Sequence, residues 1–279
     1  MRKKPLEITC YVAGAGAFGV FFRWLQNQLA FDELGLNEKS LLNFLVPALL
    51  IAAALLFRHF VQDMKEQKLY APESFCGAFF NPGKLFMILR IFAGFVMVAG
   101  AGLLLLQSET DKYAELIRVL CGLAALSGIA FPLCLNAANY DGLRHEKLVR
   151  LGMMLPVLTF ALWLVLCYLE NAYNSVAWSY AMEIAALIFL MLGFFRAAGF
   201  AYRVWDGHKT LLAVMLGAAA GIMALADERY MGMQLILLAA AGMQVLYVWI
   251  LVRNLEKKRP VTHKQGDAEV DDGGFEVVR

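Results

Sequence analysis

Two residues of opposite charge, Arg23 and Glu183, stand inside long apolar stretches of this sequence. At 1.5 Å of rise per helical residue, Arg23 would lie roughly 10 Å and Glu183 roughly 12 Å below the same face of a membrane. A charge in the hydrocarbon core costs about 2.5–3.5 kcal/mol on insertion scales, so it needs a partner or a wet cavity. Because charges at such depth mark ligand and ion sites, they favour binding of a small polar ligand.

Polar side chains share helix faces with these two charges. Gln26 and Asn27 follow Arg23 at i+3 and i+4, and Ser179 and Tyr180 precede Glu183 by about one turn. We therefore predict an outward-facing ligand site formed by Arg23, Gln26, Asn27, Ser179, Tyr180 and Glu183. The alternative is a buried ion pair between Arg23 and Glu183 that only fixes helix packing. The sequence leaves both interpretations open.

Patterns that could suggest catalysis lack their companions. Leu126-Ser127-Gly128 resembles the serine motif of an intramembrane protease, but that chemistry needs a histidine base, and the four histidines are all assigned to the cytoplasmic side or the tail. The 5 cysteines form no CxxC pair, which is typical of small hydrophobic residues rather than of a metal or disulfide framework. We expect no enzymatic activity, no cofactor, no metal site and no nucleic-acid partner.

The segment Gly14-Ala15-Gly16-Ala17-Phe18-Gly19 matches the GxGxxG spacing of dinucleotide-binding turns. That motif requires a preceding strand and a surrounding βαβ unit, and here only a short N-terminal stretch comes first. A close-packed helix surface explains the glycines better, because glycine lets neighbouring helices approach. The same packing role is predicted for Gly100, Gly102, Gly122, Gly128, Gly217 and Gly221.

The elements that must position these residues are membrane-spanning helices. The chain has 279 residues, of which 61% are hydrophobic and 17% charged. Soluble domains average about 45–50% apolar and about 25% charged residues. A helix needs about 20 mostly apolar residues to cross a bilayer. Eight segments qualify, at residues 8–30, 41–61, 84–106, 114–136, 148–169, 176–201, 210–226 and 232–253.

The placement of Lys and Arg predicts that both termini are cytoplasmic. Of the 25 basic residues, the outer side would hold only Arg23, Lys39, Lys112, Arg118 and Arg229. This bias follows the positive-inside rule, and a wrong number of spans would scramble it. We therefore predict an all-α transmembrane bundle of about eight helices over residues 1–253. A disordered, charged cytoplasmic tail is expected at residues 254–279.

The longest inner connection, about residues 62–83, is predicted to carry an amphipathic helix at the membrane interface. Pro72 would open this helix, and Phe75, Phe79 and Phe80 would form its apolar face. Near the inner end of the fourth span, Asn136, Asn139 and Tyr140 fall on one face. Helix capping and interhelical hydrogen bonds are the favoured interpretation of that face, and an inner gate is the alternative.

Short similarities between the two halves suggest a parallel repeat of two four-helix units. Asp111-Lys112-Tyr113 joins spans three and four, and Glu228-Arg229-Tyr230 joins spans seven and eight. Spans two and six both end in Phe-Arg, at Phe57-Arg58 and Phe195-Arg196.

Two stretches carry a family resemblance. Gly16-Ala17-Phe18-Gly19-Val20-Phe21-Phe22-Arg23-Trp24-Leu25-Gln26 and Ala226-Asp227-Glu228-Arg229-Tyr230-Met231-Gly232-Met233-Gln234 resemble an uncharacterised family of bacterial multi-pass membrane proteins. The resemblance implies a bacterial cytoplasmic membrane and no particular activity. The expected function is transporter- or permease-like, with the lipid bilayer and a small-molecule ligand as partners. The alternative is a non-catalytic sensor, scaffold or partner-binding subunit.

Overall fold

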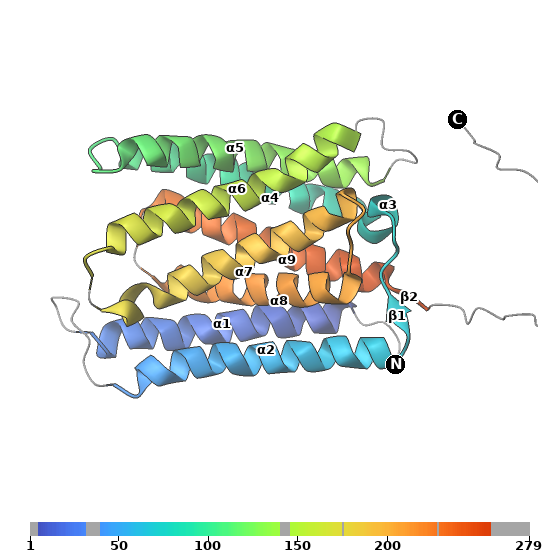
Figure 1. Cartoon of the computed structure of the whole chain (residues 1–279), viewed down its shortest axis with the longest axis horizontal. Coiled ribbons are helices and arrows are strands. Elements are labelled where there is room, and N and C mark those ends of the chain that lie inside the picture. Colours follow the sequence, from blue (N-terminus) through green and yellow to red (C-terminus); the bar gives the residue numbers. More distant parts are fainter. Residues whose placement is uncertain (1–4, 32–39, 140–145, 175, 228, 258–279) are drawn as a thin grey trace, which may run out of the picture.

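The computed structural model of the chain describes residues 5–31, 40–139, 146–174, 176–227 and 229–257 (Figure 1). Within these residues, eight helices are long and apolar enough to cross a membrane. They are α1 (Pro5–Leu29), α2 (Leu42–Glu66), α4 (Lys84–Gln107), α5 (Ala114–Ala137), α6 (Glu146–Asn171), α7 (Ala177–Ala201), α8 (Gly207–Met223) and α9 (Met231–Asn254). The predicted all-α bundle of eight spans is confirmed, and the chain is a multi-pass membrane protein.

The outer surface of the bundle is apolar. Large side chains on α1, α2 and α4 face away from the neighbouring helices, and each is at least 54% exposed: Phe18, Phe21, Ile51, Phe92 and Phe95. An apolar surface spread over several helices is not stable in water. In a bilayer, these side chains contact the lipid chains.

Helices α8 and α9 form the centre of the bundle. Over their apolar stretches 72% and 67% of residues are buried, against 17% for α1 and α2. The α1–α2 hairpin covers one side of α8, while α4, α5 and α6 lie on the other side of the molecule (Figure 1). This arrangement gives no support to two equivalent halves. Helices α7 and α8 pack along each other, whereas α2 and α4, their counterparts, do not pack closely within the described residues.

Several predicted glycine contacts hold the helices together. A Cβ atom on Gly94 of α4 would lie 2.3 Å from the carbonyl oxygen of Gly128 on α5, and one on Gly128 would lie 2.7 Å from the carbonyl oxygen of Gly94. Gly16 and Gly19 face Ile222 and Met223 of α8, so the GxGxxG segment is a packing surface. Gly100, Gly217 and Gly221 also abut neighbouring helices. Three others, Gly14, Gly102 and Gly122, face open space, so the packing prediction was wrong for Gly102 and Gly122.

The contrast between these glycines yields a matched test. We expect Gly94→Ala and Gly128→Ala each to lower the free energy of unfolding by about 1–3 kcal/mol, because the added methyl meets backbone atoms that cannot rotate away. Gly102→Ala and Gly122→Ala, on the same two helices, are expected to change it by about 0.5 kcal/mol or less. Unfolding in mixed detergent micelles measures all four, and equal losses would contradict the assigned contact.

The end of the bundle at which α1 begins and α9 ends, here called the terminal end, is closed by short elements. Strand β1 (Leu69–Tyr70) pairs antiparallel with β2 (Glu256–Lys257), and α3 (Phe75–Phe79) follows β1. Helix α3 begins after Ser74, whose hydroxyl accepts from the Gly77 N–H at 3.0 Å, rather than at Pro72 as predicted. Phe79 is fully buried against Phe200 and Tyr247.

The predicted interfacial helix was therefore wrong, because α3 packs on the bundle itself and its aromatic face covers α7 and α9. The first residues after α9 are also packed against the bundle. Asn254 donates to the carbonyl oxygens of Ala78 and Phe80, each at 2.9 Å, and β2 follows. The rest of the predicted tail, residues 258–279, lies outside the described residues.

The polar cluster near this end is a set of interhelical hydrogen bonds. Arg90 on α4 donates to Asn136 on α5 at 3.1 Å, and Asn139 accepts from the backbone N–H of Asn81 at 2.8 Å. The predicted interhelical hydrogen bond is thereby confirmed for Asn136, whereas Asn139 and Asn81 lie just outside α5 and α4 and join the segments next to these helices. Tyr140 lies outside the described residues.

Candidate functional site

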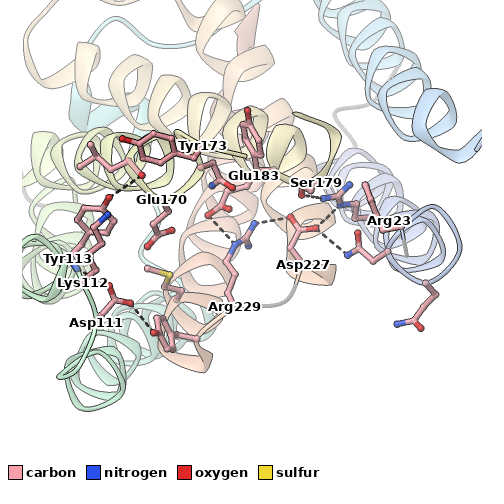
Figure 2. Close-up of a pocket in the computed structure, with 18 residues that line it drawn as sticks. Arg23, Asp111, Lys112, Tyr113, Glu170, Tyr173, Ser179, Glu183, Asp227 and Arg229 are labelled. Carbon is pink, nitrogen blue, oxygen red and sulfur yellow. Dashed lines mark hydrogen bonds and ion pairs between the residues drawn. The ribbon is translucent and has the colours of Figure 1, made fainter. Parts of the chain in front are cut away.

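A cavity of about 830 Å³ opens at the end of the bundle opposite the terminal end (Figure 2). It lies among the ends of α1 and α6, the start of α7, the α4–α5 loop and the connection from α8 to α9. Its lining is Arg23, Asn27, Gln28, Phe31, Asp111, Lys112, Tyr113, Leu169, Glu170, Asn171, Tyr173, Ser179, Tyr180, Glu183, Asp227, Arg229, Tyr230 and Met233. Polar and charged side chains therefore dominate a space that begins at the surface and descends into the bundle.

The short helix α8 explains why the cavity is deep. It has 17 residues, whereas the other seven spans have 24–26. The 3-10 turn η1 (Ala224–Ala226) and the connection to α9 consequently begin below the level at which α1 ends and α7 begins (Figure 1). As a result, Asp227 and Arg229 lie within the bundle. A connection at the level of the other helix ends would expose them to water.

Arg23 is buried at the base of this cavity and is 1% exposed. Its Nε donates to Asp227 Oδ1 at 2.6 Å, and its Nη1 donates to Gln26 Oε1 at 2.6 Å. The carbonyl oxygens of Trp178 and Ser179 accept from Nη1 and Nη2 at 3.2 and 2.7 Å. One guanidinium group therefore joins α1, the start of α7 and the connection to α9.

Arg229 continues the network toward α7. Its Nη2 donates to Asp227 Oδ2 at 2.8 Å, and its Nη1 donates to the carbonyl oxygen of Ala224 at 3.0 Å. Its Nε lies 3.1 Å from Glu183 Oε1, an ion pair in which the N–H direction falls outside hydrogen-bond geometry. Trp163 Nε1 also donates to Glu183 Oε1, at 3.1 Å. We call Arg23, Asp227, Arg229 and Glu183 the charge network.

This network corrects the sequence interpretation of Arg23 and Glu183. The two residues share the cavity, as expected, but they do not pair directly, because Asp227 and Arg229 stand between them. Neither bridging residue was predicted as part of the site. The signal was present in the sequence: opposite charges sit two residues apart in a very short connection after the shortest span.

The remaining predicted site residues divide in two. Asn27, Ser179 and Tyr180 line the cavity, and Asn27 donates to the carbonyl oxygen of Ala226 at 3.1 Å. Gln26 does not line it. Its side chain is 1% exposed and connects Arg23 to Asn43 Oδ1 of α2, at 2.8 Å. Gln26 is thus a structural bridge between α1 and α2 in this arrangement.

A second group of ionisable residues lies on the side of the cavity away from α1. Asp111 accepts from the Tyr230 hydroxyl at 2.9 Å and from the Tyr113 N–H at 2.9 Å. The hydrogen bond to Asp111 and its negative charge raise the pKa of Tyr230. The ammonium group of Lys112 lies 5.1 Å from the centre of the Tyr113 ring. Glu170 makes no hydrogen bond or ion pair with any described residue, and its carboxylate points into the open space (Figure 2).

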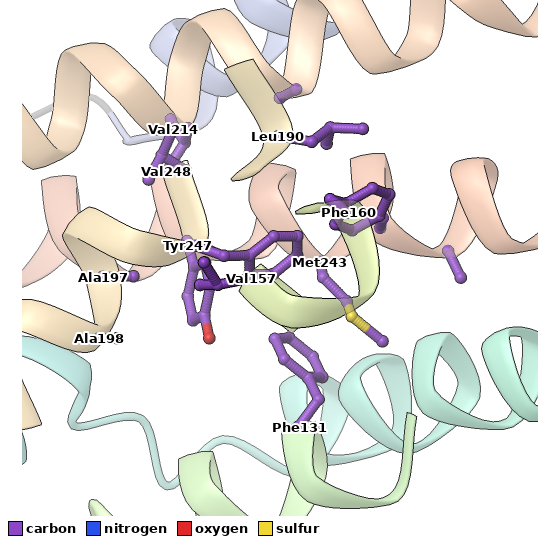
Figure 3. Close-up of a cluster of buried hydrophobic side chains, with 14 of the residues drawn as sticks. Phe131, Val157, Phe160, Leu190, Ala197, Ala198, Val214, Met243, Tyr247 and Val248 are labelled. Carbon is purple, nitrogen blue, oxygen red and sulfur yellow. The ribbon is translucent and has the colours of Figure 1, made fainter. Parts of the chain in front are cut away.

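Aromatic side chains close the bundle beneath the charge network. Trp163 and Phe160 stack at 6.1 Å, Phe160 and Phe194 at 5.8 Å, and Phe194 meets Tyr247 edge-on at 6.0 Å. Tyr247 in turn contacts Phe131 at 5.4 Å (Figure 3). These rings form an aromatic column from the cavity floor toward the terminal end, and each ring in it is at most 3% exposed.

Within the described residues, no group of three or more His, Cys, Asp or Glu side chains is arranged to hold a metal ion. Comparison of the chain with models of known protein families, with curated proteins and with solved structures finds no match.

Proposed function

We propose that this membrane protein is transporter- or permease-like and binds a small polar ligand in the outer cavity, without catalysing a reaction. The observation that supports this best is the cavity itself. It has a volume of about 830 Å³ and lies at one end of the bundle. The aromatic column fills the path from it to the other end. This is the shape of one access state of a carrier, open on one side and closed on the other.

The charges support the same proposal. Lys and Arg are concentrated at the terminal end, so the cavity end would face outward. The resemblance of Gly16–Gln26 and Ala226–Gln234 to bacterial multi-pass proteins favours the bacterial cytoplasmic membrane as the location. A ligand would then arrive from outside the cell.

One observation favours the alternative of a sensor, scaffold or partner-binding subunit. The charge network is nearly buried, with Arg23 and Arg229 side chains 2% and 6% exposed. In this alternative, the charges only hold the helices together. Such a protein needs no second access state. The two candidates therefore differ in whether the cavity ever opens toward the cytoplasm.

Labelling of engineered cysteines by a membrane-impermeant thiol reagent separates the two. The 5 native cysteines are first replaced, and Tyr180→Cys is placed in the cavity. We expect labelling from outside in intact cells and also from the cytoplasmic face in inside-out vesicles, because a carrier exposes its site alternately. Labelling of Tyr180→Cys from outside alone would contradict transport and favour the scaffold.

Two further positions serve as controls for the reagent. Glu109→Cys, exposed in the α4–α5 loop outside the cavity lining, should be labelled from outside only. Ser127→Cys, fully buried between α5 and α6, should be labelled from neither side. Cytoplasmic labelling of Glu109→Cys would show leaky or mixed vesicles rather than alternating access.

A further inference from the structure

The arginine residues of the cavity are already occupied by the protein. Arg23 makes four hydrogen bonds, and Arg229 contacts Asp227, Glu183 and the carbonyl oxygen of Ala224. Their carboxylate partners, Asp227 and Glu183, are neutralised by the same contacts. The network has no net charge and offers an anionic ligand no available guanidinium group.

Outside the charge network, acidic groups outnumber basic ones in the cavity lining. Asp111 accepts hydrogen bonds from Tyr230 and Tyr113, which are neutral donors. Glu170 has no partner among the described residues, and Figure 2 shows its carboxylate directed into the space between Asp111 and Arg229. Against these two carboxylates stands one cation, Lys112, which is exposed in the α4–α5 loop beside the Tyr113 ring.

The lining also contains aromatic rings that suit a positively charged ligand. Tyr113, Tyr173, Tyr180 and Tyr230 all contribute to the cavity wall. An organic ammonium group is attracted to the face of a tyrosine ring by about 0.5–1 kcal/mol at exposed sites and by more when desolvated. A carboxylate that has no hydrogen-bond or ion-pair partner among the described residues and shares a cavity with tyrosine rings is suited to an organic amine.

We propose that the ligand of the outer cavity is a small organic cation, a primary or quaternary ammonium compound, whose charge is received by Glu170. This inference rests on the proposed function, since it names the ligand class of the same cavity. Asp111 adds negative potential on one side, and the charge network gives the floor a fixed, neutral surface. A small inorganic cation holds its hydration shell more tightly and has no apolar groups to contact the tyrosine rings, so an organic cation fits the lining better.

The test uses the full chain in lipid nanodiscs and two probes, tetramethylammonium chloride and ethanolamine hydrochloride. Sodium chloride at equal ionic strength and sodium acetate are the comparison salts. We expect at least one organic cation to raise the melting temperature in a saturable manner, with no such effect of the two sodium salts. Glu170→Gln should weaken the affinity by about 10-fold or more, since it removes a charge-assisted contact.

Matched variants show whether the effect belongs to Glu170. Glu115→Gln removes a carboxylate that is exposed outside the cavity and paired with Arg118, so cation affinity should not change. Glu170→Asp keeps the charge and should retain more affinity than Glu170→Gln. Because Glu170 makes no hydrogen bond or ion pair with a described residue, its replacement should leave the bundle folded, which the melting temperature without ligand verifies.

Three results would overturn the assignment: stabilisation by acetate instead of the ammonium probes, cation binding that is unchanged in Glu170→Gln, or no saturable effect of either probe. None of these decides the proposed function, because cysteine labelling at Tyr180 uses no ligand. Acetate binding together with two-sided labelling would leave transport standing and remove the cation. Ammonium binding together with outside-only labelling would support the cation as ligand and remove transport.

Discussion

Asp227→Asn should be the most destabilising single change in the charge network, with an expected loss of about 3–5 kcal/mol in the free energy of unfolding. Asp227 is the only one of the four residues that contacts both arginines, at 2.6 Å to Arg23 and 2.8 Å to Arg229. The substitution keeps the size and shape of the side chain. It leaves two nearly buried guanidinium groups and only one carboxylate in the network, Glu183, which contacts Arg229 and leaves Arg23 without an ion-pair partner.

Unfolding of the purified protein in mixed detergent micelles measures this loss. The control is Glu115→Gln, which breaks an ion pair of similar length, 2.6 Å, whose two side chains are 51% and 84% exposed. An exposed pair contributes about 0–1 kcal/mol, so this control should be almost unchanged. If Asp227→Asn were as mild as Glu115→Gln, the network would be open to water, and its residues would be available to a ligand after all.

The sequence was a good guide to the spans and a poor one to their packing. Length, hydropathy and the bias of Lys and Arg predicted all eight helices, including the short seventh span that became α8. The neighbours of each helix could not be predicted in the same way. Lipid tails are as apolar as the interior of a bundle, so the inward face of a membrane helix carries no contrast in hydrophobicity. Only close-packed glycines such as Gly94 and Gly128 mark such faces, and Gly122, similar in sequence context, faces open space.

The same limit explains which parts of the site were found. Arg23 and Glu183 are conspicuous because they interrupt apolar stretches. Asp227, Arg229 and Glu170 lie at or beyond the predicted ends of spans, where charged residues are ordinary. Their importance depends on how far each helix end stands from the surface, and this follows from the packing of the short α8 against longer neighbours. Gln26 was included in the site although it does not line the cavity. It accepts from Arg23, as the i+3 spacing suggests, but its amide group donates to Asn43 on α2.

The second large effect should appear when Arg23→Gln and Glu183→Gln are combined. These residues lie at opposite ends of the charge network and do not contact each other. Each single change leaves a buried network with one uncompensated charge, and we expect each to cost about 3 kcal/mol, less than Asp227→Asn because each breaks one ion pair instead of two. The double change removes one charge of each sign. It leaves Asp227 and Arg229 as an intact pair, so its cost should fall below the sum of the two single costs by about 0.5–3 kcal/mol.

The double-mutant cycle needs a control that removes a carboxylate of the same cavity without touching the network. Combining Arg23→Gln with Glu170→Gln does this, and the two costs should simply add. Additivity of Arg23→Gln with Glu183→Gln would mean that Asp227 and Arg229 do not transmit the interaction, and the network would reduce to two separate pairs. Single changes that leave stability intact would have a different meaning. Arg23 and Glu183 would then be dispensable for the fold, and a direct role in ligand binding would become the better explanation of charges held so deep.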